Sequence, residues 1–184
     1  MIKIIMLFAF LMFVFIMSIF FILVILKISS EKKRREDLKE QAEKLNFSFN
    51  PIKNIPIDKF KLLKKGYWPA TFNVLKGIID KHKITIFDYK YTSGVGQSKT
   101  THFQTVMMVE KKVSDFSIRG KEENKIKELF GESAEVLFKN HTIKSNIEAK
   151  DNKVIFFTLY KRIKATDLEE FIKTNIQIIN SLKK

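Results

Sequence analysis

The chain contains no cysteine, only three prolines and only four arginines among its 184 residues. Without cysteine it forms no disulfide, holds no metal through thiolates and has no cysteine nucleophile. The 34 basic residues are therefore mostly lysine, and the net charge is +14. Because bidentate recognition of bases and phosphates favours arginine, we expect this charge to form a solvated surface, and we do not expect nucleic acid as a partner.

Charge is also absent from one long stretch near the N-terminus, which begins at Ile4, ends at Leu26 and lacks glycine and proline. As an α-helix these 23 residues extend about 34 Å, more than the ~30 Å of bilayer hydrocarbon. A cleaved signal peptide has an apolar region of ~7–15 residues that ends at small residues, and this chain shows neither feature. We therefore predict a retained transmembrane anchor in contact with the lipid bilayer.

Basic residues are distributed unequally on the two sides of this apolar run. Lys3 alone precedes it, and five basic residues follow it closely: Lys27, Lys32, Lys33, Arg34 and Arg35. The side richer in lysine and arginine usually stays in the cytoplasm. We therefore predict a single-pass protein of the cell membrane with its N-terminus outside and its soluble domain in the cytoplasm. The same five cations are candidates for contacts with anionic lipid headgroups.

Composition divides the chain into four segments. We assign residues 1–27 to the anchor, 28–46 to a juxtamembrane helix, 47–70 to a connector and 71–184 to a soluble domain. The connector contains all three prolines, and we expect one short helix or strand in it, near residues 60–63.

The soluble domain begins with three segments rich in β-branched and aromatic residues, at 72–79, 84–91 and 100–109. They predict an antiparallel three-stranded meander. The glycine-containing loop at 93–98 is followed by the Lys-Thr pair typical of a phosphate-binding loop. The two required glycine positions hold serine instead, and a strand follows where phosphate binding needs a helix. We therefore favour a hairpin turn.

A helix and a hairpin are predicted next. Residues 122–130 predict a helix that ends at Gly131, and 132–139 predict a second short helix. A second hairpin is expected between 143–149 and 154–160.

The last helix is amphipathic and continues to the C-terminus. Thr166 and Glu169 have the spacing of a capping box, which would begin this helix. Because strand groups and helix groups alternate in blocks, the expected fold is α+β, with a single N-terminal transmembrane helix followed by the meander, the second hairpin and this C-terminal helix.

Asp88 lies in the middle of the second predicted strand, on the face of its isoleucines. An unpaired carboxylate there would be costly, so a structural hydrogen bond is the simpler interpretation, and a general acid or base is the alternative. If the hairpin is centred on Gly96, Gln104 lies opposite Asp88, whereas a shift of one residue places Phe103 there.

No catalytic or metal-binding pattern stands out elsewhere. The three histidines, His82, His102 and His141, have none of the spacings typical of a metal site, and no serine lies in a hydrolase motif. We therefore expect neither a metal nor a cofactor.

Several short motifs occur together in the meander. They are Phe87-Asp88-Tyr89-x-Tyr91, Gly94-x-Gly96, Thr100-Thr101 and Gln104-Thr105-Val106. In this pattern the chain resembles an uncharacterised family of bacterial membrane-associated proteins. The resemblance implies membrane attachment and the fold but no activity. It marks six residues without assigning them a role: Asp88, Tyr89, Tyr91, Gly94, Gly96 and Gln104.

Together these patterns favour a membrane-anchored binding protein, an accessory or scaffold for another membrane or envelope protein, over an enzyme. One alternative is a sensor of anionic lipid headgroups that uses Lys32, Lys33, Arg34 and Arg35 and the lysine patch from Lys59 to Lys65. A second alternative is a hydrolase that uses Asp88 as general acid or base.

Overall fold

The computed structural model describes residues 2–119, 122–131 and 145–182. It divides into two compact units, Met1–Asp37 and Leu38–Lys184, and each is described by itself. The helix predicted at 132–139, the first two residues of the strand predicted at 143–149 and His141 lie outside the described residues.

The first unit consists of one helix, α1 (Ile2–Lys44), whose last residues belong to the second unit. Every side chain between positions 10 and 26 is exposed. The helix is long and apolar enough to cross a membrane, with a mean hydropathy of 2.9 in its most apolar part. It continues without interruption through the segment for which a juxtamembrane helix is predicted.

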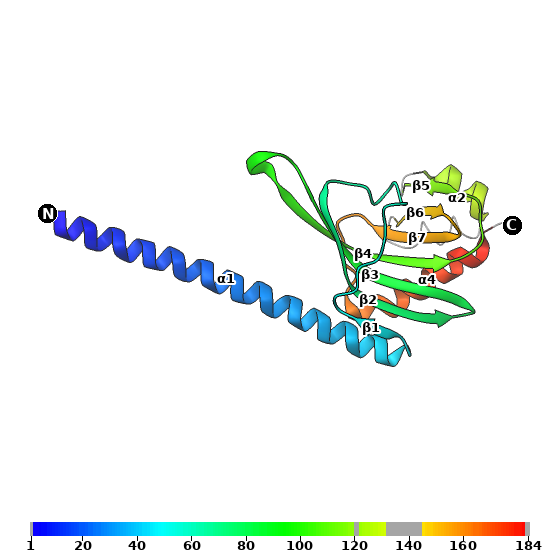
Figure 1. Cartoon of the computed structure of the whole chain (residues 1–184), viewed down its shortest axis with the longest axis horizontal. Coiled ribbons are helices and arrows are strands. Elements are labelled where there is room, and N and C mark those ends of the chain that lie inside the picture. Colours follow the sequence, from blue (N-terminus) through cyan, green and yellow to red (C-terminus); the bar gives the residue numbers. More distant parts are fainter. Residues whose placement is uncertain (1, 120–121, 132–144, 183–184) are drawn as a thin grey trace. The chain divides into compact units, whose positions relative to one another are not determined.

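The second unit is built on one antiparallel sheet of seven described strands in the order β1-β2-β3-β4-β7-β6-β5 (Figure 1). The strands are β1 (Ser48–Asn50), β2 (Tyr67–Ile79), β3 (His82–Ser93), β4 (Thr100–Glu110), β5 (Phe116–Ile118), β6 (Ser145–Lys150) and β7 (Lys153–Thr158). With the helices described below, the sheet gives an α+β fold, as the sequence predicts.

The central strands are apolar on both sides. In β4, Met107 and Val109 belong to one hydrophobic core, and Val106 and Met108 belong to the other. Successive side chains of a strand point to opposite faces of the sheet. A strand that is apolar at every position therefore needs a cover on each face.

Helices cover the first face. They are α2 (Glu123–Phe130), α4 (Leu168–Ser181), which lies across one side of the sheet in Figure 1, and the last turns of α1. Their buried apolar residues are Leu38 and Ala42 from α1, Ile126 and Phe130 from α2, and Leu168, Phe171, Ile172, Ile176, Ile178 and Ile179 from α4. Burial of one such large side chain contributes about 1.5–3 kcal/mol, so the predicted amphipathic C-terminal helix is a main part of this core.

An irregular segment, residues 51–66, covers the second face, and we call it the strap. Ile55, Phe60, Leu62 and Leu63 of the strap are buried and form the second core with the aromatic side chains of β3. The prediction of a short helix or strand at 60–63 is wrong, because the chain forms turns there. The apolar residues of the strap reach the sheet at irregular intervals, which neither a helix nor a strand would allow.

A buried carboxylate holds the strap on the sheet. Glu148 in β6 is 3% exposed and accepts hydrogen bonds from the backbone N–H groups of Lys61 and Leu62, at 2.8 and 2.7 Å. Backbone groups of an irregular segment have no ladder partners and still need acceptors when they are buried. The Glu148 side chain provides the acceptor for two of them.

Three predicted parts of the domain are confirmed. The meander is β2-β3-β4, the second hairpin is β6-β7, and α2 ends before Gly131, whose φ of 85° suits a glycine after a helix. Both two-residue turns, at 80–81 and 151–152, have positive φ at each position, as expected for tight hairpins.

Two short strands were not predicted, and the predicted capping box is wrong. β1 and β5 have three residues each, too few to show an alternating pattern. α4 is preceded by a 3-10 turn (Ala165–Asp167), so that Asp167 becomes the residue before the helix. The Thr166 hydroxyl donates to the Asp167 carboxylate at 2.8 Å, and the side chain of Asp167 makes no cap hydrogen bond.

We expect Glu148→Ala to lower the free energy of unfolding by about 2–4 kcal/mol, because one buried and one partly buried N–H group of the strap lose their acceptor. Denaturant unfolding of the full chain in mild detergent measures this change. Glu110→Ala is the matched control, because that carboxylate is exposed and pairs with Lys83 at 3.6 Å. It should change stability by less than about 1 kcal/mol, and equal losses in the two variants would contradict the role assigned to Glu148.

Candidate functional site

A buried polar cluster surrounds Asp88 on the helix-covered face. Asp88 is 1% exposed, and its carboxylate accepts hydrogen bonds from the Asn73 amide and the Thr105 hydroxyl, each at 3.0 Å. The Thr105 hydroxyl oxygen in turn accepts the N–H of Ile163 at 3.0 Å. The structural hydrogen bonds predicted for Asp88 are confirmed, and they tie β2, β3 and β4 to the segment before α4.

A local irregularity in β2 positions Asn73 for this contact. The pairing of β2 with β3 shifts between Phe72 and Leu75, and Asn73 adopts a φ of 52°. Asparagine tolerates this left-handed conformation better than most residues, and a bulge re-aims the side chain of the bulged strand. Asn73 is thereby buried beside Asp88.

The register of the β3-β4 hairpin differs from both predicted alternatives. Thr105 lies opposite Asp88, Gln104 lies opposite Tyr89, and Phe103 lies opposite Lys90. The reason is the loop, which has six residues between the last pair, Ser93 and Thr100, and includes a 3-10 turn (Gly96–Ser98). A loop with an even number of residues has its centre between two residues, so the hairpin is not centred on Gly96.

The two marked glycines of this loop differ in importance. Gly94 has a φ of 90°, and a Cβ there would lie 2.2 Å from the carbonyl oxygen of Ser98, so the loop closes only with glycine at this position. Gly96 has a φ of 60° but open space around it. The hairpin turn that the sequence favours over a phosphate-binding loop is confirmed, since the strand β4 follows it.

Tyr89, Tyr91 and Gln104 lie on the strap-covered face and are all buried. The Tyr89 and Tyr91 rings stack at 5.5 Å, and the row continues through His102, at 5.0 Å from Tyr91, to the exposed Tyr160. Burial raises the pKa of both the Tyr89 and the Tyr91 hydroxyl. Among the described residues no partner hydrogen-bonds the Oε1 atom of Gln104.

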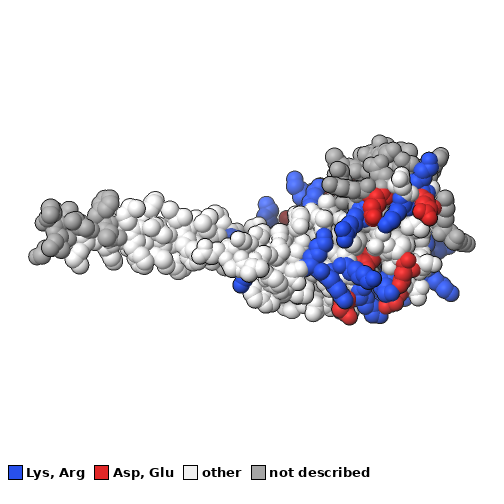
Figure 2. Space-filling model, turned by 90° about the horizontal axis from the view of Figure 1, so that it is seen from above, with Lys and Arg blue, Asp and Glu red and all other residues white. Residues whose placement is uncertain are grey.

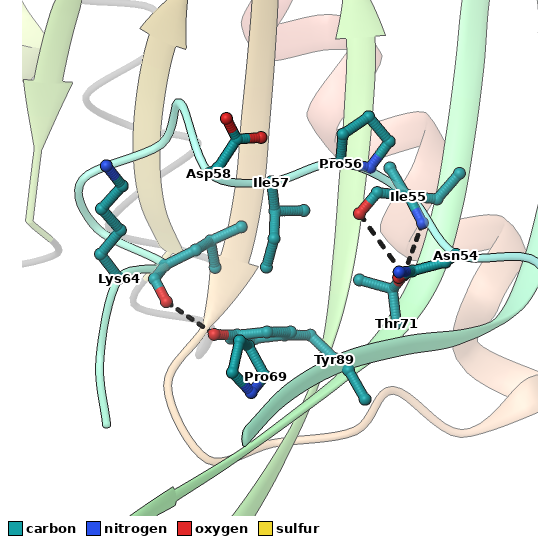
Figure 3. A pocket seen from close by; sticks show the side chains of 11 residues that line it. Asn54, Ile55, Pro56, Ile57, Asp58, Lys64, Pro69, Thr71 and Tyr89 are labelled. Carbon is teal, nitrogen blue, oxygen red and sulfur yellow. Dashed lines mark hydrogen bonds between the residues drawn. The ribbon is translucent and has the colours of Figure 1, made fainter. Parts of the chain in front are cut away.

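A small cleft of about 240 Å³ opens between the strap and the sheet (Figure 3). Tyr89 lines it and donates its hydroxyl hydrogen bond to the carbonyl of Leu63 at 2.7 Å. Thr71, also in the lining, accepts the N–H of Ile55 at 2.6 Å and donates to the Asn54 side chain at 2.6 Å. These polar groups already serve the strap, and the volume is below the ~300–1,000 Å³ of typical small-molecule sites. We assign the cleft no ligand.

The β3-β4 hairpin extends beyond its neighbours (Figure 1). Exposed apolar residues occur near its end. β7 pairs with β4 only from Val106 onward, so the first half of β4 lies beyond β7. We call Tyr67, Trp68, Val95 and Lys99 the tip. Trp68 is 66% and Val95 is 85% exposed. The Lys99 ammonium lies 5.3 Å from the Trp68 ring centre, and Tyr67 meets that ring edge-on at 5.7 Å.

Trp68 is held in a strained conformation. Its φ is 54°, and it lies in a second irregularity of β2, between Tyr67 and Ala70. A bulky residue with positive φ costs on the order of 1–3 kcal/mol, and such strain is concentrated at functional positions. Trp68 is not among the site residues predicted from the sequence. The available signal was that the only tryptophan of the chain stands next to a proline, which in sheets is confined to edges and bulges.

Basic residues dominate the face of the domain in Figure 2, with acidic residues among them, whereas α1 shows little charge over most of its length. The five predicted membrane-flanking cations all lie on α1. Lys27, Lys32, Lys33 and Arg35 are exposed and Arg34 is half-buried. Lys32 also approaches Glu36 at 3.9 Å, a pair one helical turn apart.

The histidines are engaged in local hydrogen bonds where they are described. His82 contacts the Asn180 side chain at 2.8 Å, and His102 contacts the Ser93 hydroxyl at 2.6 Å.

Comparison of the chain with protein-family models, curated proteins and solved structures finds no match. The resemblance to a family of membrane-associated proteins therefore stays a prediction.

Two substitutions of Asp88 should differ in their effect on the free energy of unfolding. Asp88→Ala should lower the free energy of unfolding by about 2–4 kcal/mol, because the Asn73 amide and the Thr105 hydroxyl lose their acceptor. Asp88→Asn should cost less, since the Asn73 amide can rotate and offer its oxygen to the new amide group. Denaturant unfolding of the detergent-solubilised chain measures both. Equal losses would argue against this hydrogen-bond account.

Tyr89 and Tyr91 should ionise only at a higher pH than usual, because burial raises the pKa of each hydroxyl in the folded chain. Protonated tyrosines with a raised pKa contribute stability that is complete below about pH 10 and is lost as the pH rises further. Ultraviolet titration should therefore show that two of the four tyrosines ionise late, together with unfolding. Tyr89→Phe should remove one late proton, and a titration in which all four tyrosines ionise in one step would contradict this expectation.

Proposed function

We propose that this chain is a membrane-anchored, non-catalytic binding protein whose domain lies in the cytoplasm and acts as an accessory or scaffold for another membrane or envelope protein. One observation carries the proposal. A single helix, α1, exposes apolar side chains throughout residues 10–26 and ends with Leu38 and Ala42 in the core of the domain.

The apolar part of α1 suits hydrocarbon better than water. Fourteen of the residues 10–26 are leucine, isoleucine, phenylalanine or valine, and at −0.3 to −0.6 kcal/mol each near a helix centre they favour insertion by about 4–8 kcal/mol. Ser18, the one hydroxyl in this stretch, donates to the carbonyl of Val14 at 2.8 Å. Its polar group is therefore satisfied within the helix, which a spanning segment requires.

The position of the basic residues supports the orientation. Lys27, Lys32, Lys33 and Arg35 are exposed on the domain side of the apolar run, and cations on that side favour a cytoplasmic domain. The contacts of Asp88 with Asn73 and Thr105 support a positioning role for this carboxylate in the fold. They favour the binding protein over the hydrolase that uses Asp88.

Cysteine labelling in intact cells tests the anchor and its orientation, because the chain has no cysteine of its own. Ser114→Cys places one thiol at an exposed position between β4 and β5. We expect a membrane-impermeant maleimide to label it only after the cells are permeabilised, and we expect the protein to stay in the membrane fraction after an alkaline wash.

Ile2→Cys is the matched control and should react in intact cells, since it lies on the other side of the apolar run. Labelling of Ser114→Cys but not Ile2→Cys in intact cells would reverse the orientation. Release of the protein by the alkaline wash would refute the anchor.

A further inference from the structure

We propose that the tip of the β3-β4 hairpin inserts into the headgroup region of the bilayer that holds α1, with Trp68 as the side chain that enters it. This inference rests on the proposed membrane anchor and adds a second contact with the lipid, made by the folded domain. The residues of the tip are distinct from the flanking cations of α1, because they lie more than 30 positions further along the chain.

The side chains of the tip have the chemistry of the membrane interface. Tryptophan and tyrosine combine an apolar ring with one polar group and are enriched where hydrocarbon meets water. Val95 adds an apolar side chain at the end of the hairpin and is 85% exposed. Lys99, 5.3 Å from the Trp68 ring, can keep its ammonium group among lipid phosphates while its alkyl chain lies along apolar surface.

The charge around the tip fits anionic lipid. Three segments meet at this end of the sheet, residues 63–72, 89–103 and 159–164, and together they contain seven basic residues and no acidic one. Contacts bring them together. Tyr89 bonds to Leu63 in the strap, and the His102 ring lies 4.6 Å from that of Tyr160. Each cation near an anionic membrane favours binding, and no carboxylate within these segments opposes it.

The chain keeps the domain close to the bilayer. Leu38, the first residue of the domain, follows Leu26, the last apolar residue of the run, by twelve positions. As a helix these positions extend about 18 Å. A domain tethered at this range meets the membrane at a high effective concentration, so a weak lipid contact suffices to hold the tip in place.

The size of the tip favours lipid over a protein partner. Trp68, Tyr67 and Val95 together expose on the order of 400 Å², about half of what each partner buries in a stable protein interface. Shallow insertion into a membrane needs no larger area. The strained φ of Trp68, 54°, is consistent with this role, since the fold accepts its cost and leaves the ring in solvent.

Fluorescence tests the proposal directly, because Trp68 is the only tryptophan of the chain. The full chain is reconstituted into liposomes of phosphatidylcholine and phosphatidylglycerol whose acyl chains carry bromine, a quencher confined to the bilayer. We expect Trp68 emission to shift to the blue relative to the emission of free tryptophan in water. We also expect it to be quenched by the brominated lipid and to be shielded from aqueous acrylamide. Omission of phosphatidylglycerol should weaken all three effects.

Val95→Asp and Ile78→Asp form a matched pair, because both replace an exposed apolar residue and Ile78 lies at the opposite end of β2, 65% exposed. Val95→Asp should reduce bromine quenching of Trp68 by more than half, and Ile78→Asp should leave it unchanged. Both variants should retain the unfolding midpoint of the parent, because both side chains are exposed.

Flotation of the liposomes separates the two proposals. A chain that does not float with the lipid refutes the anchor. A chain that floats while Trp68 remains quenched by acrylamide and not by bromine keeps the anchor and overturns the insertion of the tip, as would equal effects of Val95→Asp and Ile78→Asp.

Discussion

The structure of the domain depends on how an apolar sheet face is covered by a segment without regular structure. The strap buries Ile55, Phe60, Leu62 and Leu63, and its own turns pair only some of its backbone groups. Side chains of the sheet pair others, and Glu148, which pairs two of them, is the central one. The strap then leads into β2 at Gly66, where a Cβ would lie 1.9 Å from the carbonyl oxygen of Thr92. This close approach fixes the chain directly before Tyr67 and Trp68, so the position of the tip follows from the path of the strap.

Much of the fold could be predicted because it is encoded in local patterns. The strands of the meander, the β6-β7 hairpin and the apolar face of α4 each show their period over eight or more residues or carry a clear turn. The strap could not be predicted from such patterns, because its apolar residues have no period and its partner, Glu148, lies 86 residues away from Leu62. The prediction of the β3-β4 register failed for a similar reason, since the register depends on the number of residues that the loop uses.

The candidate site was predicted only in its buried part. Asp88 could be identified because a carboxylate among isoleucines demands a partner, although its partners are Asn73 and Thr105, and Thr105 rather than Gln104 lies opposite it. Trp68 could not, because its exposure follows from an irregularity in the pairing of β2 with β3 that no local sequence rule specifies. The two groups differ in what they contribute. Asp88 and Glu148 use their carboxyl oxygens inside the protein to accept hydrogen bonds and hold segments together, whereas the tip leaves its aromatic and cationic groups facing outward.

The two outermost described strands of the sheet, β1 and β5, have only three residues each. The part of β2 that runs past β1 contains Pro69, which has no N–H to offer to a further strand. Open strand edges are templates for the addition of strands from other molecules. For copies confined to the plane of a membrane, as proposed for this chain, collisions between domains are frequent, and a long open edge would join them into ribbons. The short outer strands and Pro69 therefore reduce the length of edge that a neighbouring copy could extend.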